Sequence, residues 1–276
     1  MTRKPILITG ASSGIGYYCA KELSKNNSYQ VYATVRSEKD YKRLTLEGLN
    51  VLYLDLNSSE SIKSCAKEFL SKTGGKVYAL FNNAGYGQPG AVEDISDEAL
   101  KEQFQTNFFG LHSLTRELLP VMRKQGFGRI INHSSVLGFV SLRFRGAYNA
   151  SKYALEGLSD TLRLELMDSD IWVSLIETGP VRSHFRKNAL KKFLQNIDRQ
   201  NSYFKDEYEK KLESLQSEKD VPFTLDADAV YKALLKALEE KEPKARYRVT
   251  KVTTIFWLLK RLLSTKRLDN ILRSIE

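Results

Sequence analysis

The feature that most constrains the fold of this 276-residue chain is a regular alternation of short apolar runs with helical stretches. Six runs have the length and composition of β-strands, at residues 5–9, 30–35, 50–54, 77–81, 129–133 and 171–176. Strands that alternate with helices predict a parallel sheet with helices on both faces, a doubly wound α/β fold. In such a fold, ligands bind beyond the carboxyl ends of the strands.

The length and the 42% hydrophobic content predict one domain over residues 1–276, built on a single large core. Residues 182–223 have no strand signal and are rich in charged and aromatic side chains. We interpret them as a helical lid over a substrate, and the alternative is a surface excursion whose aromatic rings pack beneath it. An amphipathic helix at 226–240 and a last strand at 246–249 are expected to follow.

Positive charge is concentrated near the end of the chain. The net charge is +10, and residues 241–276 hold ten basic and three acidic side chains. This imbalance predicts a local basic surface, and no nucleic-acid-binding signature accompanies it. The C-terminal extension, residues 250–276, reads as a basic amphipathic helix that lies on an anionic membrane surface or covers the substrate opening. Docking on its own domain or on a partner subunit is the alternative.

Other sequence features argue against several classes of protein. Cys19 and Cys65 are too few for a disulfide framework, and the apolar stretch at 252–263 is shorter than the roughly 20 residues of a spanning helix. With no signal-peptide pattern at the start, we expect a cytoplasmic protein with at most peripheral membrane contact. The scattered histidines indicate no metal site and need no role. His133 precedes Ser134, but a hydrolase would show a Gly-x-Ser-x-Gly elbow.

A glycine-rich turn follows the first predicted strand and opens a helix, over residues 9–16. Glycines there permit a tight turn and let the backbone approach a pyrophosphate, whose charge is met by the helix N-terminus. This Rossmann-type context predicts a dinucleotide site. Its candidate residues are Gly10, Ser12, Ser13, Gly14, Ile15 and Gly16.

A tyrosine and a lysine four residues apart, Tyr148 and Lys152, share one face of a predicted helix. An ammonium beside a phenol stabilises the phenolate, so a hydroxyl with an ordinary pKa of about 10 is expected to exchange protons nearer neutrality. By itself this spacing usually means one packed ring and one solvated amine. Ser135, thirteen residues before Tyr148, gives the pair a partner.

The glycine spacing and the motifs that follow it resemble the short-chain dehydrogenase/reductase family, from residue 6 to about residue 183. Residues 82–85 are similar to the segment that shapes the adenine and ribose side of the cofactor pocket, with Asn83, Ala84 and Gly85 as contacts. Asn107 resembles the helix residue that helps to hold a water beside the catalytic lysine. The resemblance implies that Ser135, Tyr148, Lys152 and Asn107 form the catalytic set, and that Lys152 also binds the nicotinamide ribose.

The second predicted strand ends in Val35-Arg36 without the carboxylate that would bind a ribose 2′-hydroxyl. A guanidinium at Arg36 can fork onto a 2′-phosphate, so NADP(H) is favoured over NAD(H). The alternative for Arg36 is an ordinary solvated charge. Asp55, with Leu56, resembles the residue that meets the adenine amino group, and its alternative is a helix cap.

The segment at 177–183 departs from the family pattern, because Thr178 replaces the expected proline and Ser183 the expected threonine. The resemblance implies that this segment faces the nicotinamide carboxamide, through Gly179, Pro180, Val181 and Ser183. A hydroxyl is preserved at residue 183, so this contact is expected to survive.

Together these features predict an NADP(H)-dependent oxidoreductase that interconverts an apolar carbonyl compound and its alcohol. The segments at 31–36 and 178–181 look most like the hydroxysteroid and retinol dehydrogenase branch. The resemblance implies a homodimer or homotetramer built on the helices at 97–123 and 148–167. Two alternatives stay open: a catalytically idle regulator that binds NADP(H), and a membrane-surface binding protein that uses the basic tail.

Overall fold

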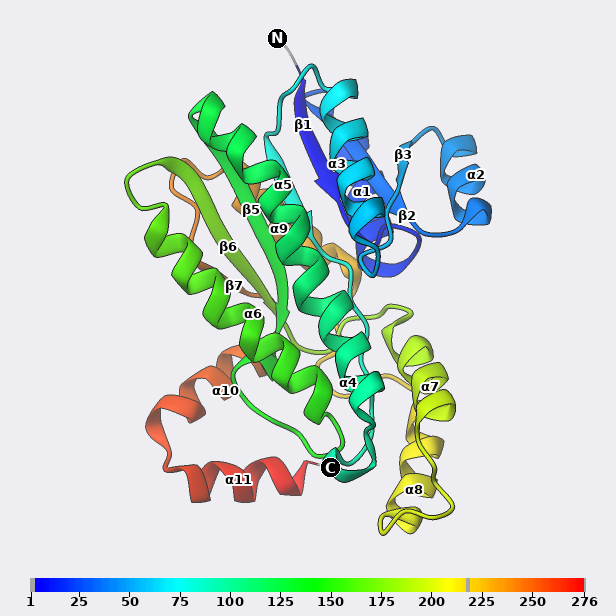
Figure 1. Ribbon diagram of the computed structural model, residues 1–276. Coiled ribbons are helices and arrows are strands. Elements are labelled where there is room, and N and C mark those ends of the chain that lie inside the picture. Colours follow the sequence, from blue (N-terminus) through cyan, green and yellow to red (C-terminus); the bar gives the residue numbers. More distant parts are fainter. Residues whose placement is uncertain (1–2, 217–218, 276) are drawn as a thin grey trace.

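The computed structural model describes residues 3–216 and 219–275 and contains a parallel sheet in the order β3-β2-β1-β4-β5-β6-β7 (Figure 1). The predicted doubly wound α/β fold and every predicted strand are confirmed, with ends that differ by a few residues. The strands are β1 (Lys4–Ile8), β2 (Tyr29–Val35), β3 (Asn50–Tyr53), β4 (Ala79–Asn82), β5 (Phe127–Ser135), β6 (Asp170–Thr178) and β7 (Arg246–Arg248).

Helices cover both faces of this sheet. Those of the central fold are α1 (Gly14–Ser24), α2 (Glu38–Leu46), α3 (Ser59–Lys72), α4 (Asp97–Phe104), α5 (Gly110–Gln125), α6 (Gly146–Glu165) and α9 (Ala227–Glu239). Two short turns, η1 (Val92–Asp94) and η3 (Val136–Gly138), are 3-10 helical, and η2 (Gln105–Phe109) is a π-helical turn that joins α4 to α5. The remaining helices are α7 (Phe185–Asn196), α8 (Lys205–Gln216), α10 (Lys251–Leu262) and α11 (Thr265–Ser274).

Alternate side chains of β1 divide the core into two layers. Ile6 and Ile8 pack with α1 and α9, whereas Leu7 packs with α3, α5 and α6 on the opposite face. All three residues are fully buried, as expected for a central strand of a parallel sheet.

Local chemistry sets where several helices begin and end. The hydroxyls of Ser37, Ser58 and Ser96 accept hydrogen bonds from backbone amides in the first turns of α2, α3 and α4. Helix α5 stops at Gly126, whose φ of 83° is the left-handed conformation that glycine tolerates best. Because all strand pairings are parallel, the carboxyl ends of the strands open on one side of the sheet.

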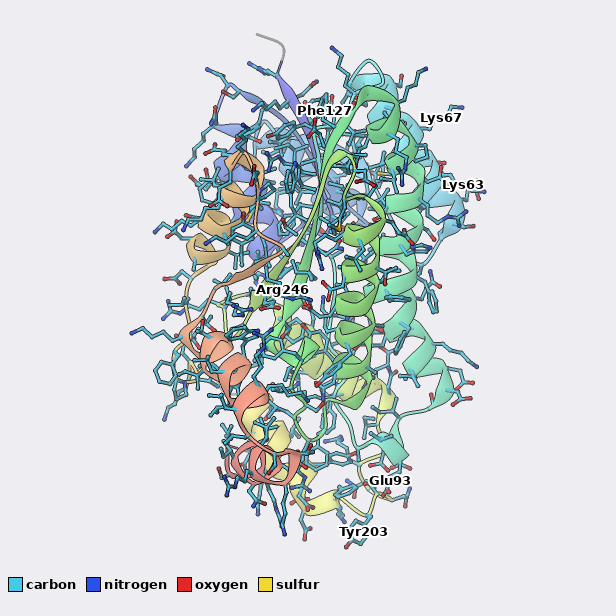
Figure 2. All side chains as sticks on the ribbon, turned by 90° about the vertical axis from the view of Figure 1, so that its left-hand side faces the viewer. Lys63, Lys67, Glu93, Phe127, Tyr203 and Arg246 are labelled. Atoms are coloured by element: carbon cyan, nitrogen blue, oxygen red, sulfur yellow. The ribbon has the colours of Figure 1, made fainter. Side chains whose placement is uncertain are left out.

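The lid and the C-terminal extension both lie on that side (Figure 1). Helices α7 and α8 form the predicted helical segment, and Figure 2 shows Tyr203 of this segment at the opposite end of the molecule from Phe127, where β5 begins. Phe193 and Tyr208 are fully buried in a cluster with Ala91. These two aromatic rings therefore pack inward from α7 and α8, as the alternative interpretation expected.

The C-terminal extension docks on its own domain. Leu268 and Leu272 of α11 are buried against Val140, in a cluster that also includes Phe256 and Leu259 of α10. The indole of Trp257 lies between two guanidinium groups, with its ring centre 3.9 Å from Arg248 and 3.8 Å from Arg261. Within residues 3–216 and 219–275, no helix is long and apolar enough to cross a membrane.

Candidate active site

The glycine turn after β1 is shaped by contacts that exclude a side chain. Gly10 and Gly14 have φ of 66° and 58°, in the left-handed region. A Cβ on Gly16 would lie 2.4 Å from the carbonyl oxygen of Gly10, and a Cβ on Gly10 would lie 2.8 Å from the Cα of Ala84. Ser13 is the N-cap of α1 and makes no side-chain capping bond, so the first amides of the helix are not satisfied by that hydroxyl. A cradle of this kind fits the pyrophosphate of a dinucleotide.

The end of β4 is tied to this turn. The hydroxyl of Thr9 accepts hydrogen bonds from the backbone amides of Asn83 and Ala84, both at 2.9 Å. In return, Nδ2 of Asn83 donates to the carbonyl oxygens of Thr9 at 3.0 Å and Gly10 at 3.3 Å. The two segments that were predicted to bind the cofactor therefore support each other.

His133, to which the sequence assigned no role, lies at the centre of the site. Because Asn83 donates through Nδ2, its Oδ1 faces the His133 ring, and Nδ1 of the histidine donates to it at 2.9 Å. The other ring nitrogen, Nε2, lies 3.2 Å from the hydroxyl of Thr178, which also contacts the carbonyl oxygen of Ser134 at 3.3 Å. Burial, reinforced by the charge of Lys152, lowers the pKa of His133 to about 3, so the ring stays neutral. The one feature of the sequence that pointed to a role for His133 was its position at the end of a predicted strand.

Lys152 extends from α6 toward the end of β5. Its Nζ donates a hydrogen bond of 2.7 Å to the carbonyl oxygen of His133, and the residue is 4% exposed. Burial lowers the pKa of this amine to about 8, and the negative charge of Glu156 opposes that shift. Lys152 therefore titrates within the range in which enzymes work.

Tyr148 lies one helical turn before Lys152, whose Nζ is 5.8 Å from the centre of the phenol ring. Burial raises the pKa of Tyr148 to about 12, and hydrogen bonding with Ser135 and the charge of Arg145 oppose the rise. The expected lowering by Lys152 does not occur in this arrangement, because burial dominates and the ammonium is directed at a backbone carbonyl. Ser135 ends β5, and its Oγ also accepts a bond of 3.1 Å from the amide of Leu137.

Asn107 is fully buried in the π-helical turn between α4 and α5. Its side chain bonds the backbone of Tyr86 on both sides, accepting from the amide at 3.1 Å and donating to the carbonyl at 2.9 Å. It also donates to Oγ of Ser151 at 3.2 Å. A Cβ on Gly85 would lie 3.2 Å from Oδ1 of Asn107. The structure therefore places Asn107 beside the 83–85 segment and next to α6.

The segment after β6 closes the opposite wall. Thr178 is paired with Ser135 in the register of the sheet. Gly179 has no room for a side chain, because a Cβ there would lie 2.3 Å from Oγ1 of Thr250. The chain then turns along the glycine-rich loop, where Ser183 lies 3.2 Å from the Cβ position of Gly14. Pro180 and Val181 lie between them, bridged to Leu225.

The remaining cofactor candidates lie in the glycine turn and just after β3. Ser12 accepts a hydrogen bond from Arg43 through its carbonyl oxygen, and Ile15 packs against the core. Asp55 accepts from the amide of Asn57 at 3.0 Å, although the cap of α3 is Ser58. The carbonyl oxygen of the buried Leu56 accepts from Gln105 at 3.0 Å.

Arg36 is exposed just after β2. The carboxylates that follow it are engaged elsewhere, Glu38 with Tyr53 and Asp40 with Arg43. Burial and the charge of Glu102 raise the pKa of Tyr86, and the positive charge of Arg36 opposes that rise.

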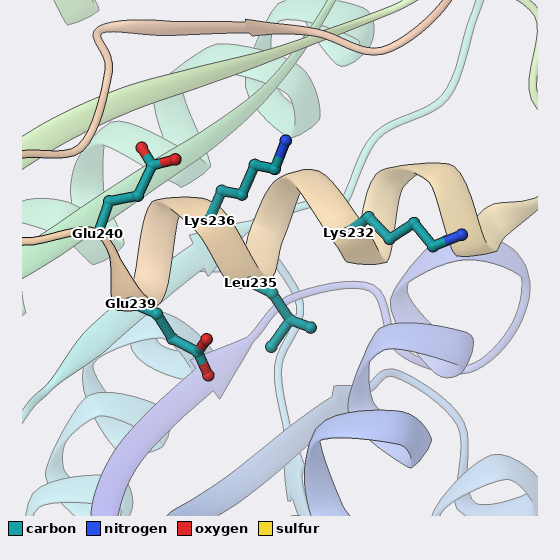
Figure 3. A pocket seen from close by; sticks show the side chains of 5 residues that line it. All are labelled: Lys232, Leu235, Lys236, Glu239 and Glu240. Carbon is teal, nitrogen blue, oxygen red and sulfur yellow. The ribbon is translucent and has the colours of Figure 1, made fainter.

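One side of the Tyr148 ring meets an aromatic side chain. The ring of Phe185, at the start of α7, meets Tyr148 edge to face with centroids 5.2 Å apart. The tip of the same ring would be 2.8 Å from a Cβ on Gly87. A different feature, a shallow depression of about 500 Å³, lies along α9 and contains none of these residues (Figure 3). Its lining residues are Lys232, Leu235, Lys236, Glu239 and Glu240.

A Rossmann-type sheet whose strand ends gather a glycine turn with a serine, a tyrosine and a lysine defines a class of dinucleotide-dependent oxidoreductases. The family model described as short chain dehydrogenase matches residues 4–193, and the chain belongs to this family.

Individual relatives agree with the family assignment. Uncharacterized oxidoreductase YbbO of Escherichia coli strain K12 is 41% identical over 278 residues, covering 98% of this chain and 94% of that protein. Human retinol dehydrogenase 8 is 39% identical over 198 residues, covering 68% of this chain and 62% of that protein. A Burkholderia phymatum short-chain dehydrogenase/reductase, solved in complex with NAD, has a TM-score of 0.78 at 24% identity, covering 94% and 92% of the two chains. The predicted similarity to the hydroxysteroid and retinol dehydrogenase branch is confirmed.

Proposed function

We propose that this oxidoreductase uses NADP(H) to interconvert an apolar aldehyde or ketone and its alcohol, with Tyr148 as the acid and base. The observation that carries the proposal is the meeting of Tyr148, Ser135 and Lys152 at the carboxyl end of β5, opposite the glycine turn. This set can hold a carbonyl oxygen and supply a proton to it.

Each residue has a distinct role in reduction. A bound nicotinamide supplies the hydride that the carbonyl carbon receives. Tyr148 donates its phenolic proton to the carbonyl oxygen, and Ser135 hydrogen-bonds that oxygen and holds it within reach. In this structure the ammonium of Lys152 bonds the carbonyl oxygen of His133. With the cofactor bound, it would bind the nicotinamide ribose and stabilise the phenolate that remains. In oxidation the proton returns to Tyr148.

Asn107 acts indirectly. Its bonds to Tyr86 and Ser151 fix the 83–85 segment against α6, and its side chain helps to hold a proton relay that ends at Lys152. On the nicotinamide side, the carboxamide is met by the loop from Gly179 to Ser183, and the adenine by Asp55 and Leu56.

The choice of NADP(H) rests on the end of β2. A 2′-phosphate requires a cation and the absence of a competing carboxylate. Arg36 is exposed there, while Glu38 and Asp40 are held by Tyr53 and Arg43. An NAD-specific site would present a free carboxylate at this point.

The proposed substrate is an apolar carbonyl compound of the retinal, long-chain aldehyde or steroid type. Phe185, packed edge to face on Tyr148, gives the catalytic tyrosine an apolar neighbour. Phe193 and Tyr208 do not add to this surface, because both are buried within the lid cluster.

Two further contacts are proposed. Large apolar side chains are exposed on α6 and beside its C-terminus, among them Leu164 at 58% and Met167 at 70%, which suits a homodimer or homotetramer. On α10, Ile255, Leu258 and Leu262 form an exposed stripe flanked by basic residues, which suits peripheral contact of a cytoplasmic enzyme with an anionic membrane.

The proposal is tested by measuring oxidation of NADPH and of NADH against a panel of apolar aldehydes and ketones, with wild type and Arg36→Ala. We expect NADPH to be preferred and Arg36→Ala to lower kcat/KM for NADPH by about tenfold to a hundredfold, since a charge-assisted contact is worth about 1.5–3 kcal/mol. Activity with NADH is expected to stay within about twofold. The matched control is Lys39→Ala, which removes an exposed cation three residues further on. It should change neither kcat/KM for NADPH nor the activity with NADH.

Two outcomes would overturn parts of this proposal. Equal use of both cofactors by the wild type would remove the role of Arg36. Binding of NADPH without turnover of any carbonyl compound in the panel would favour the idle regulator.

A further inference from the structure

A buried carboxylate lies one helical turn beyond Lys152 on the same face of α6. Glu156 is 8% exposed, and its Oε1 accepts a hydrogen bond from the hydroxyl of Ser134. Its Oε2 accepts from Nε and Nη2 of Arg246 in β7, at 3.2 and 3.0 Å. Ser134 stands between His133, whose carbonyl binds Lys152, and Ser135. Glu156 therefore holds the strand residue that separates two members of the site.

Arg246 connects Glu156 to the rest of a charged cluster. In Figure 2, Arg246 is labelled above the C-terminal helices. Its guanidinium also binds Asp160 at 2.7 Å and Glu177 at 3.0 Å. Glu177, only 1% exposed, pairs with Arg248 at 3.2 Å. Asp160 also pairs with Arg163 at 3.3 Å, so three acidic groups face three arginines and the ammonium of Lys152. Burial raises the pKa of Glu156 and raises that of Glu177 to about 7. Loss of one of these acidic groups would leave more buried positive charge without a partner.

We propose that Glu156, held by Arg246, is a positioning residue that fixes the end of β5 and stabilises the ammonium form of Lys152. The inference deepens and rests on the proposed function, since Lys152 is the residue on which it acts.

The charges around Glu156 and Lys152 determine whether the pKa of Lys152 rises or falls when residue 156 carries no charge. Burial lowers the pKa of Lys152, and Glu156 is the group that opposes this. His133, from β5, is neutral and contributes no charge that could replace it. Arg246 and Arg248 from β7 are cations, so an uncharged residue 156 would leave Lys152 facing unbalanced positive charge, partly offset by Glu177 from β6 and by Asp160.

The test is a titration of Lys152 itself. Protein labelled with 13C at the lysine Cε is followed by NMR from pH 6 to 11, and the signal is assigned with Lys152→Arg. In Glu156→Gln, we expect the midpoint to fall by about one pH unit relative to wild type. Asp160→Asn is the matched control, because Asp160 binds the same arginine from the next turn of α6 and is more exposed. The titration midpoint of Lys152 in Asp160→Asn should match that in the wild type.

Turnover supplies a second readout. We expect the alkaline limb of the pH profile of Glu156→Gln to move in the same direction as the NMR midpoint, with cofactor affinity retained. An unchanged midpoint in Glu156→Gln, or an equal fall in Asp160→Asn, would overturn the inference. A protein without turnover in which the NMR midpoint still falls would contradict the proposed enzyme activity and leave the role of Glu156 supported.

Ser134→Ala covers the case in which Glu156→Gln does not fold. This variant keeps the charge of Glu156 and removes only its bond to β5. We expect an unchanged Lys152 midpoint with turnover reduced about tenfold or more, because the serine beside it shifts. Unchanged turnover would overturn the positioning role.

Discussion

The ammonium nitrogen of Lys152 lies 2.7 Å from the carbonyl oxygen of His133, while the ring of the same histidine bonds Asn83 and Thr178. One residue of β5 therefore connects the catalytic helix with the ends of β4 and β6. Because the His133 ring has a pKa of about 3, it adds no charge to this junction in the working pH range. Within this junction, Lys152 is the group whose charge changes, near pH 8.

The pH dependence of reduction should follow Lys152. Its pKa of about 8 lies below the ordinary value for lysine, so the ammonium is present below pH 8 and is lost as the pH rises through that value. Tyr148, with a pKa of about 12, keeps its proton throughout. We therefore expect kcat/KM for carbonyl reduction to be flat at pH 6–7 and to fall toward tenfold per unit above about pH 8.

Lys152→Arg distinguishes deprotonation of Lys152 from a general loss of activity at alkaline pH, because a guanidinium stays charged. Its rate is expected to be lower, but without the decline that begins near pH 8. A wild-type profile of kcat/KM that stays flat to pH 10 would contradict the prediction.

Replacement of the proposed proton donor is expected to abolish turnover while leaving the fold intact. Tyr148→Phe removes the hydroxyl and keeps the ring that packs on Phe185. The loss of general acid catalysis should reduce kcat by about a hundredfold to ten-thousandfold, with the affinity for NADPH within about threefold of wild type. Tyr153→Phe, on the same helix and 38% exposed, is the control and should remain active. A kcat for Tyr148→Phe within about tenfold of wild type would refute the role of Tyr148.

The strands, the glycine turn and the serine, tyrosine and lysine could be predicted because local patterns specify them. Apolar periodicity marks a strand, and Tyr148 and Lys152 share a helix face by spacing alone. The role of His133 could not be predicted in this way, since it depends on the side chains that adjacent strand ends present to one ring. The pKa of Tyr148 was misjudged for a similar reason, because spacing shows a neighbouring charge but not the burial of both groups.

The lid and the tail illustrate the same limit. Aromatic composition indicated an apolar surface, yet whether Phe193 faces substrate or core depends on the packing of the lid on Ala91. Amphipathic periodicity in α10 and α11 predicted an apolar face without identifying what covers it. In the structure, apolar side chains of both helices, among them Leu268 and Leu272 of α11, pack with Val140, five residues after Ser135.

The close approach at the glycine turn gives a prediction about stability and binding. In Gly16→Ala, the new methyl group would overlap the carbonyl oxygen of Gly10 at 2.4 Å. We expect a loss of about 1–3 kcal/mol in the free energy of unfolding, with NADPH binding weakened at least tenfold because the turn must shift. Denaturant unfolding and fluorescence titration of NADPH measure the two effects.

Gly157→Ala is the matched control for Gly16→Ala. It lies on an exposed face of α6 with no atom within 4 Å of the Cβ position. Alanine there should leave NADPH binding unchanged, because the position lies far from the glycine turn along the chain and meets no neighbouring atom. Equal behaviour of the two variants would contradict the steric account of Gly16.

The docked tail changes how membrane contact must be tested. Deleting residues 251–276 would uncover Val140 and remove Thr250's neighbour Thr253 beside Gly179, so lost activity would say nothing about lipid. The outer face of α10 is separable from this packing. Its stripe consists of Ile255, Leu258 and Leu262, which are 46%, 45% and 77% exposed.

We expect the wild type to bind vesicles that contain phosphatidylserine and to be released by high salt, since basic residues flank the stripe. Replacing all three stripe residues with serine should lower binding at least tenfold, because each removes apolar area worth on the order of 1 kcal/mol, while turnover is kept. Leu46→Ser, which removes a leucine that is 89% exposed on α2, should bind vesicles as the wild type does. Sedimentation with vesicles measures all three proteins. If the triple variant binds as strongly as wild type, or if wild type binds neutral vesicles equally well, the stripe and its flanking charges are not a membrane contact.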